Sequence, residues 1–213
     1  MLLAEDVLLL ATDDQTGKKL ARYTDLLIGG ALLSDLTLAG NVRLSEPGES
    51  VRKNRAVNVP DAAWPVDPLL SDAVAVIGGK PAWFPSVLVD RLGRKVVDTV
   101  YERLARAELV SRKPHRVLGL VPTTRWVSVD GRHEAQLRAR LDEVFLFGAE
   151  PDPHTAALIA LLTGAGLLVP VVDRGRNLDR RSLKRQGKVF LNQYWPAQAM
   201  ERAFQGRDSA AAG

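Results

Sequence analysis

The stretch Thr155–Val172, TAALIALLTGAGLLVPVV, is a run of 18 residues without a charged side chain. Its length is near the lower limit for a membrane-spanning helix. However, it holds two glycines and Pro170, and Asp173 follows directly. A proline disfavours continuation of a helix. We therefore expect a buried central helix from Thr155 to Leu168, followed by a short extended exit, in place of a membrane span.

Outward from this run, apolar residues recur at helical spacing in several other stretches. In Val87–Leu109, which has the longest clear helical pattern, Val89, Leu92 and Val96 share one face. Residues 46–68 are polar and are expected to form a loop, after a short extended piece at Val42–Leu44. The expected helices are Leu2–Ala11, Asp25–Gly40, Pro68–Ile77, Val87–Leu109, His133–Phe147 and Leu178–Phe204.

One segment has a different pattern. His115–Val121 and Arg125–Val129 are two short segments containing valine, and a Pro122-Thr123-Thr124 turn separates them. The sequence therefore predicts a β-hairpin in an otherwise mainly α chain. The expected architecture is a single-domain helical bundle over residues 1–208, with a central buried hydrophobic core, amphipathic outer helices and a frayed tail at 209–213.

The composition is typical of a globular domain and excludes chemistry that depends on cysteine. The chain has 213 residues, 46% of them hydrophobic, which is ample for one core. It has no cysteine, so disulfides, thiolate zinc sites and cysteine nucleophiles are excluded. Glu5 and Asp6 lie where a signal peptide would need an apolar stretch. We therefore expect a cytoplasmic protein.

The positive charge is concentrated near the C-terminus. The formal net charge is +4, and the residues from Arg174 onward include nine basic and three acidic side chains. Such asymmetry favours contact with phosphates of nucleic acid or of anionic lipid headgroups. An ordinary solvated helix face is the alternative interpretation.

Motifs of catalysis are missing. His115, His133 and His154 lie far apart and do not have the spacing of a metal-binding motif. The glycine pairs lack the pattern of a phosphate-binding loop, and no GxSxG elbow occurs. We therefore expect neither enzymatic activity nor a metal or cofactor.

Several motifs resemble the Golgi phosphoprotein 3 family, in order along residues 2–205. The matching segments are Leu3–Leu10 with the acidic turn ending at Gly17, Ala31–Val42, Val100–Ala105, the hairpin with Thr123-Thr124, and Leu158–Leu162. The short sequence, rich in Ala, Arg and Val, is most similar to the bacterial, actinobacterial, branch. The resemblance implies a mostly helical domain that binds membranes peripherally through phosphatidylinositol 4-phosphate. In eukaryotic members it also implies sorting of Golgi glycosyltransferases.

The lipid site of the family is not matched residue by residue. Its tryptophan and three arginines align with Leu20, Gly29, Asp98 and Tyr101, none of which is basic. A headgroup phosphate needs cationic donors, and Asp98 would repel it. Nearby cations could form a displaced headgroup pocket, or they could be ordinary surface charges. They are Lys18, Lys19, Arg22, Arg94 and Lys95.

The hairpin is a candidate for shallow membrane insertion. Its apolar residues are Val117, Leu118, Leu120 and Val121, and Arg112, Lys113, Arg116 and Arg125 surround them. An apolar tip ringed by cations suits an anionic interface. Trp126 would fit the same interface, since tryptophan favours such positions. The alternative is an edge hairpin that packs on its own domain or on another subunit.

We therefore expect a non-catalytic, peripheral membrane protein that binds anionic phospholipid headgroups on the inner face of the membrane. Two alternatives stay open. A helix followed by a basic hairpin is the layout of a winged-helix nucleic-acid binder, although Asp90, Asp98, Glu102 and Glu108 disfavour a groove-facing helix. An adaptor for protein cargo would use the same kinds of surface.

Overall fold

The central helix is α7 (Pro153–Gly164), and the other helices pack around it. The computed structural model describes residues 1–117 and 121–213. Residues Leu158–Leu162 of α7 are completely or almost completely buried, as expected for a central core helix. The expected extended exit is wrong, because residues Leu168–Asp173 form the short helix α8. Pro170 lies in the first turn of α8, where a missing N–H is tolerated.

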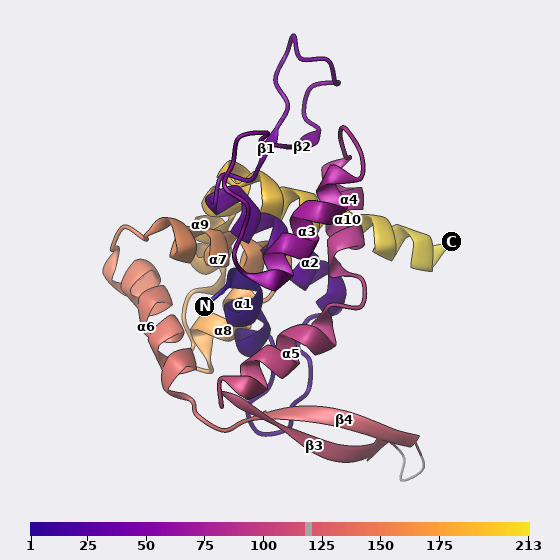
Figure 1. The fold of residues 1–213 in the computed structure, drawn as a ribbon. Coiled ribbons are helices and arrows are strands. Elements are labelled where there is room, and N and C mark those ends of the chain that lie inside the picture. The colour runs from indigo at the N-terminus through magenta and orange to yellow at the C-terminus, as the bar shows by residue number, and fades with distance from the viewer. Residues whose placement is uncertain (118–120) are drawn as a thin grey trace.

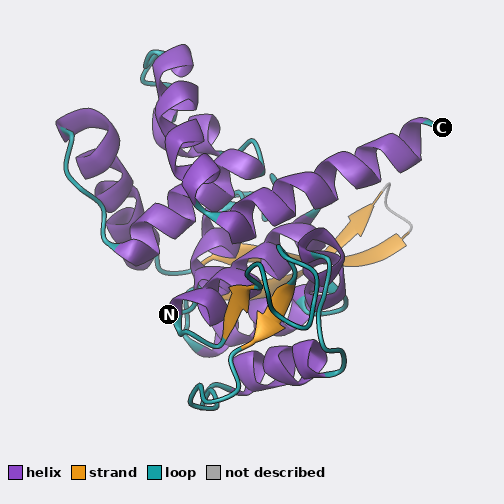
Figure 2. Ribbon diagram, turned by 90° about the horizontal axis from the view of Figure 1, so that it is seen from above, coloured by secondary structure: helices purple, strands orange, loops and turns teal. Residues whose placement is uncertain are grey.

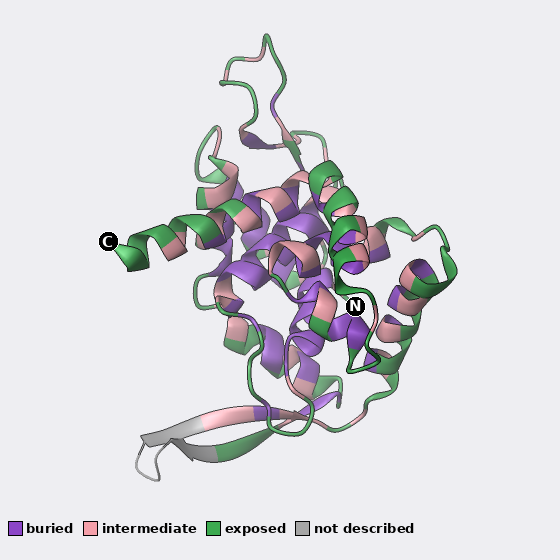
Figure 3. Cartoon of the chain, turned by 180° about the vertical axis from the view of Figure 1, so that it is seen from behind, coloured by how far each residue is buried: buried purple, intermediate pink, exposed green. Residues whose placement is uncertain are grey.

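Two further helices complete the core. In α1 (Leu3–Leu10) every residue is buried, including Glu5 and Asp6. Helix α2 (Thr24–Leu38) contacts both α1 and α7, and its residues from Leu26 to Leu36 are buried. The buried residues of these elements lie at the centre of the domain in Figure 3. The expected mainly α architecture with a buried central helix is therefore confirmed.

The expected helix Val87–Leu109 is divided in two. Helix α4 (Pro85–Gly93) ends before Arg94, which is extended, and Lys95 has a φ of 60°. Helix α5 (Val97–Arg106) then runs in a new direction (Figure 1). The apolar periodicity continues across the break because both helices bury a face against the same core. The break itself follows Gly93, a poor helix former.

The polar segment between α2 and α3 (Pro68–Gly78) is more regular than expected. Strand β1 (Val42–Leu44) pairs antiparallel with β2 (Ala56–Asn58), so the predicted loop at 46–68 contains a strand. Residues 45–55 project from one end of the molecule (Figure 1).

The C-terminal part is also divided. The sequence predicts one helix over Leu178–Phe204, but α9 (Arg180–Gln193) and α10 (Trp195–Ala212) are separate. The break is at Tyr194, two residues before Pro196, whose ring would clash with a continuing helix. Helix α10 includes residues 209–212, which the sequence assigns to a tail, and it extends away from the bundle in Figure 2. Helix α6 (Arg132–Phe147) covers the side of the bundle near α8.

The hairpin consists of β3 (Val110–Val117) and β4 (Val121–Ser128) and projects from the helices (Figure 1). The expected turn at Pro122–Thr124 is wrong, since Pro122 pairs with Arg116 and Thr124 with Pro114. The connection is therefore residues 118–120, which lie outside the described residues. Its sequence includes Gly119, the usual residue of a short hairpin loop.

No helix in the described parts of the chain combines the length and the apolar character needed to cross a bilayer.

Candidate anionic-ligand surface at the hairpin

Aromatic stacking anchors the hairpin to the helical domain. The ring of Trp126 on β4 stacks on that of Tyr101 on α5, with centroids 5.3 Å apart and an interplanar angle of 4°. Trp126 is only 8% exposed and Tyr101 only 1%. Trp126 therefore packs on the helical domain in this structure. The sequence allowed both this position and a membrane interface, because tryptophan suits buried and interfacial sites alike.

A hydrogen-bond chain continues from this stack into the core. The hydroxyls of Tyr101 and Thr12 are 2.8 Å apart, and the Thr12 hydroxyl donates to the carbonyl of Leu8 at 2.7 Å. Burial raises the pKa of the Tyr101 phenol above its usual range, so it stays a neutral donor. The base of the hairpin is thus tied to α1 as well as to α5.

The segment between α1 and α2 lies against β4. The backbone N–H of Ser128 donates to the carbonyl of Asp14, and Arg125 donates to the carbonyl of Thr16. Gly17 has a φ of 63°, and a Cβ at this position would lie 2.5 Å from the Trp126 carbonyl oxygen. Glycine is therefore required here by both conformation and space. This contact brings Lys18 and Lys19 to the hairpin.

Five cations gather around the base of the hairpin, and we call them the hairpin cations. They come from the Gly17 segment and from both strands. Within the described residues, no ion pair involves any of them. The hairpin cations are Lys18, Lys19, Arg112, Lys113 and Arg125.

Two of these cations face each other. Lys113 and Arg125 are directly opposite in the antiparallel register. Like charges in this position destabilise a strand pair. The arrangement therefore leaves positive charge that an external anion could neutralise.

Between the hairpin and α5 lies a pocket of about 350 Å³ with mixed charge. Lys19 and Arg112 line it beside Trp126, and the ammonium of Lys19 is 5.6 Å from the Tyr101 ring centroid. The carboxylates of Asp98 and Glu102 line the same pocket. These acids limit how deeply a phosphate could enter, so the exposed strands offer the more favourable anion surface.

The other three candidate cations, Arg22, Arg94 and Lys95, are not among the hairpin cations. Arg22 pairs with Asp208 at 2.8 Å, and Arg94 pairs with Asp90 on the same helix at 2.7 Å. Lys95 is exposed at the break between α4 and α5. Of the five cations expected to form a displaced pocket, the structure brings Lys18 and Lys19 to the hairpin.

Of the four positions aligned with the family lipid site, three lie near the hairpin and one does not. Asp98 lines the hairpin pocket, Tyr101 lies beneath Trp126, and Leu20 is 43% exposed next to Lys19. Gly29 instead lies in the contact between α2 and α4, where a Cβ would be 2.0 Å from the carbonyl oxygen of Val89. An arginine side chain has no room at this position.

The expected membrane-facing residues at the tip are only partly described. Leu118 and Leu120 lie outside the described residues, and the side chains of Val117 and Val121 do as well. Their role therefore stays a prediction from the sequence.

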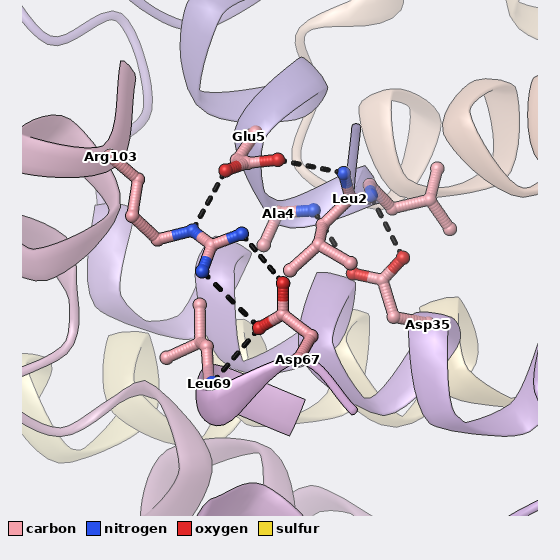
Figure 4. Close-up of polar contacts among 8 residues, drawn as sticks. Leu2, Ala4, Glu5, Asp35, Asp67, Leu69 and Arg103 are labelled. Carbon is pink, nitrogen blue, oxygen red and sulfur yellow. Dashed lines mark hydrogen bonds and ion pairs between the residues drawn. The ribbon is translucent and has the colours of Figure 1, made fainter. Parts of the chain in front are cut away.

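A buried ionic network beneath α1 was not predicted from the sequence. Arg103 of α5 donates to Glu5 at 2.8 Å and to Asp67 at 2.7 Å, while Asp67 caps the start of α3 (Figure 4). Asp35 of α2 accepts hydrogen bonds from the backbone N–H groups of Leu3 and Ala4. Burial outweighs these bonds and raises the pKa of Asp35 to about 7.

The histidines that seem unrelated in sequence also meet. The Nε2 atoms of His133 and His154 each lie 2.7 Å from a different oxygen of the Asp6 carboxylate. Burial raises the pKa of Asp6, but the two histidine hydrogen bonds outweigh it, so the pKa is lower than usual. Sequence spacing missed this cluster because its members come from α1, α6 and α7. No group of three metal-ligating side chains with suitable geometry occurs in the described part of the chain.

The fold and this surface define a mainly helical domain whose projecting β3–β4 hairpin has, among the described residues, cations without ion-pair partners at its base. The sequence profile of the Golgi phosphoprotein 3 (GPP34) family matches residues 3–206. The chain therefore belongs to the Golgi phosphoprotein 3 family. A search of the curated proteins found no match.

Proposed function

We propose that this protein is a peripheral membrane protein that binds anionic phospholipid headgroups through its hairpin. The observation that carries this proposal is the projecting β3–β4 hairpin with the hairpin cations around its base. The protein acts without catalysis, at the inner face of the membrane.

The electrostatic contribution is substantial for a surface of this size. Each Lys or Arg near an anionic bilayer contributes about 1 kcal/mol. Arg112 and Lys113 are exposed and adjacent on β3, and Arg125 lies across from Lys113. Phosphates at the membrane surface would reduce the repulsion between Lys113 and Arg125. Because this repulsion is larger in the free protein than in the bound protein, it favours binding.

The apolar residues at the tip would supply the second contribution. Leu118 and Leu120 lie in the sequence between the paired ends of the strands. Apolar side chains that enter the boundary between headgroups and acyl chains add a hydrophobic contribution to electrostatic attraction. Binding would then depend on both charge and the tip.

A winged-helix contact with nucleic acid is less well supported. The helix that precedes the hairpin is α5, and its exposed Asp98 and Glu102 line the pocket beside Arg112. These carboxylates would repel a phosphate backbone that followed both the helix and the hairpin.

Headgroup specificity is the finer part of the proposal. Phosphatidylinositol 4-phosphate is the ligand that the family resemblance implies, but the aligned positions hold no cation and Gly29 has no room for one. We infer that binding here depends on anionic charge at the surface more than on one headgroup.

Co-sedimentation with liposomes tests the proposal. The vesicles contain phosphatidylcholine alone, or with phosphatidylinositol, its 4-phosphate, or phosphatidylglycerol, each at 50 and 500 mM salt. We expect binding to every anionic vesicle at low salt and a marked loss at high salt, because salt screens exposed charges. A strong preference for the 4-phosphate would contradict the inference on specificity. No binding to any anionic vesicle would contradict the proposed function.

A further inference from the structure

A second candidate site lies on another side of the molecule, where α7, α8, α9 and α10 meet. A groove of about 240 Å³ opens between them. Its apolar lining is Leu168, Val169 and Leu191. Lys184 and Lys188 of α9, with Glu201 of α10, line the same groove.

Glycines shape this groove. Gly187 brings α9 close to α8, since a Cβ there would lie 2.4 Å from a methyl carbon of Leu168. Gly166 turns the chain between α7 and α8 with a φ of 73°, and a Cβ there would meet no atom within 4 Å. The helices are thus held together tightly while the turn beside them leaves space unfilled.

The exposed face of α9 is strongly cationic. Arg181, Lys184 and Arg185 are exposed, and none has an ion-pair partner among the described residues. Lys188 pairs with Glu201 at 3.0 Å, which neutralises the one carboxylate that lines the groove. The charge left at the mouth is therefore positive and belongs mainly to Lys184.

We propose that this groove binds a free single-chain anionic amphiphile of the fatty-acid type. Lys184 contacts the carboxylate, and the alkyl chain lies on Leu168, Val169 and Leu191. Because a water molecule takes about 30 Å³ in the liquid, the groove has room for about eight groups of that size. It is smaller than the pockets that hold drug-sized ligands, which favours one short alkyl chain over the two chains of a diacyl lipid.

This site is independent of the hairpin. Helix α9 lies within the helical bundle, away from the β3–β4 hairpin that projects from it (Figure 1). A substitution at Lys184 therefore leaves liposome binding through the hairpin unchanged, so the two proposals fail separately.

Nuclear magnetic resonance titration of the full chain with octanoate tests the site. We expect saturable amide shifts at Gly166, Leu168 and Gly187. Acetate has the carboxylate without the long alkyl chain, and octanol has the alkyl chain without the carboxylate. Each should bind at least about tenfold more weakly than octanoate.

Charge and shape variants complete the test. Lys184→Glu removes the contact with the carboxylate, and Val169→Trp fills the groove at a half-buried position. Each should weaken octanoate binding about tenfold, whereas the matched control Lys113→Glu on β3 should not. The proposal is wrong if Lys184→Glu leaves the affinity unchanged, if octanol binds as well as octanoate, or if the shifts lie elsewhere. Should Val169→Trp not fold, Lys184→Glu alone decides.

Discussion

At the scale of single residues, Gly17 connects the hairpin to the rest of the domain. Gly17→Ala should lower the free energy of unfolding by about 2–3 kcal/mol, because it adds the cost of a left-handed backbone to a contact of 2.5 Å with the Trp126 carbonyl. Gly40 is the matched control, since its φ is 75° and a Cβ there would touch nothing within 4 Å. Urea denaturation of both variants measures the cost of the left-handed backbone, which both share, and the cost of the contact with Trp126, which only Gly17→Ala has. Equal losses would show that the Trp126 contact is not tight.

Asp35 gives the stability a specific pH dependence. Its pKa is raised from 3.8 to about 7 by burial, so the native state holds a proton that the unfolded state has released. The contribution is fully present below about pH 4 and is lost as the pH rises through 7, at about 1 kcal/mol per pH unit. Glu134, also raised to about 7 by burial, acts in the same direction.

Asp35→Asn should therefore flatten the fall in unfolding free energy between pH 5 and 7. Asparagine cannot ionise, and it keeps one acceptor oxygen for the N–H of either Leu3 or Ala4, which donate to different oxygens of Asp35. The lost hydrogen bond lowers the stability at every pH alike, so the slope remains the readout. The slope should be reduced and not abolished, because Glu134 still titrates in this range. Chemical denaturation at pH 5, 6 and 7 measures the slope. A variant with the wild-type slope would show that Asp35 is ionised in the native state throughout.

At the scale of elements, the crossing of α2 and α4 depends on two glycines. A Cβ on Gly29 would lie 2.0 Å from the Val89 carbonyl oxygen, and one on Gly93 would lie 1.9 Å from that of Asp25. Gly29→Ala should cost about 3 kcal/mol or more, since the helices must separate to admit the methyl group.

Gly206 in α10 is the control for this crossing. A Cβ there would meet nothing within 4 Å, and alanine is the better helix former. Gly206→Ala should be neutral or slightly stabilising in thermal denaturation. If Gly29→Ala were equally well tolerated, the close crossing would be wrong, and so would the exclusion of an arginine from that position.

The elements also show what sequence patterns can predict. Periodicity identified the buried central helix and the hairpin, because apolar burial sets both patterns. It could not place the break at Arg94 and Lys95, since the apolar face continues from α4 into α5. The hairpin register was missed because Pro122-Thr123-Thr124 has the composition of a turn, whereas the strand pairing extends through it.

The candidate site could be predicted only in part, because some of its contacts join residues that are far apart in the sequence. Lys18 and Lys19 were expected near a lipid site, and the Gly17 contact does bring them to the hairpin. For Trp126 the sequence allowed both a membrane interface and a place against the domain, because its stacking on Tyr101 is a tertiary contact between residues far apart in sequence. The Asp6 cluster with His133 and His154 has the same origin.

At the scale of the whole molecule, some cations form ion pairs within the helical bundle, and others lie on the surface without an ion-pair partner among the described residues. Arg103 and Arg207 each bridge two carboxylates and hold helices together. The hairpin cations, and Arg181, Lys184 and Arg185 on α9, form no ion pair among the described residues, whereas Arg180 and Lys188 of α9 pair with Asp173 and Glu201. The hairpin and α9 are therefore separate cationic surfaces of the helical bundle, and the hairpin also has apolar residues at its tip in the sequence.

Liposome binding by two charge-reversal variants tests whether the protein binds membranes through its hairpin. Arg112→Glu combined with Lys113→Glu reverses two exposed hairpin cations, and Arg52→Glu combined with Lys53→Glu reverses two exposed cations at the other end of the molecule. With phosphatidylglycerol vesicles at 50 mM salt, the hairpin variant should bind at least about tenfold more weakly than wild type, and the control should bind within about twofold of it. Equal weakening by both variants, or none by either, would contradict binding through the hairpin.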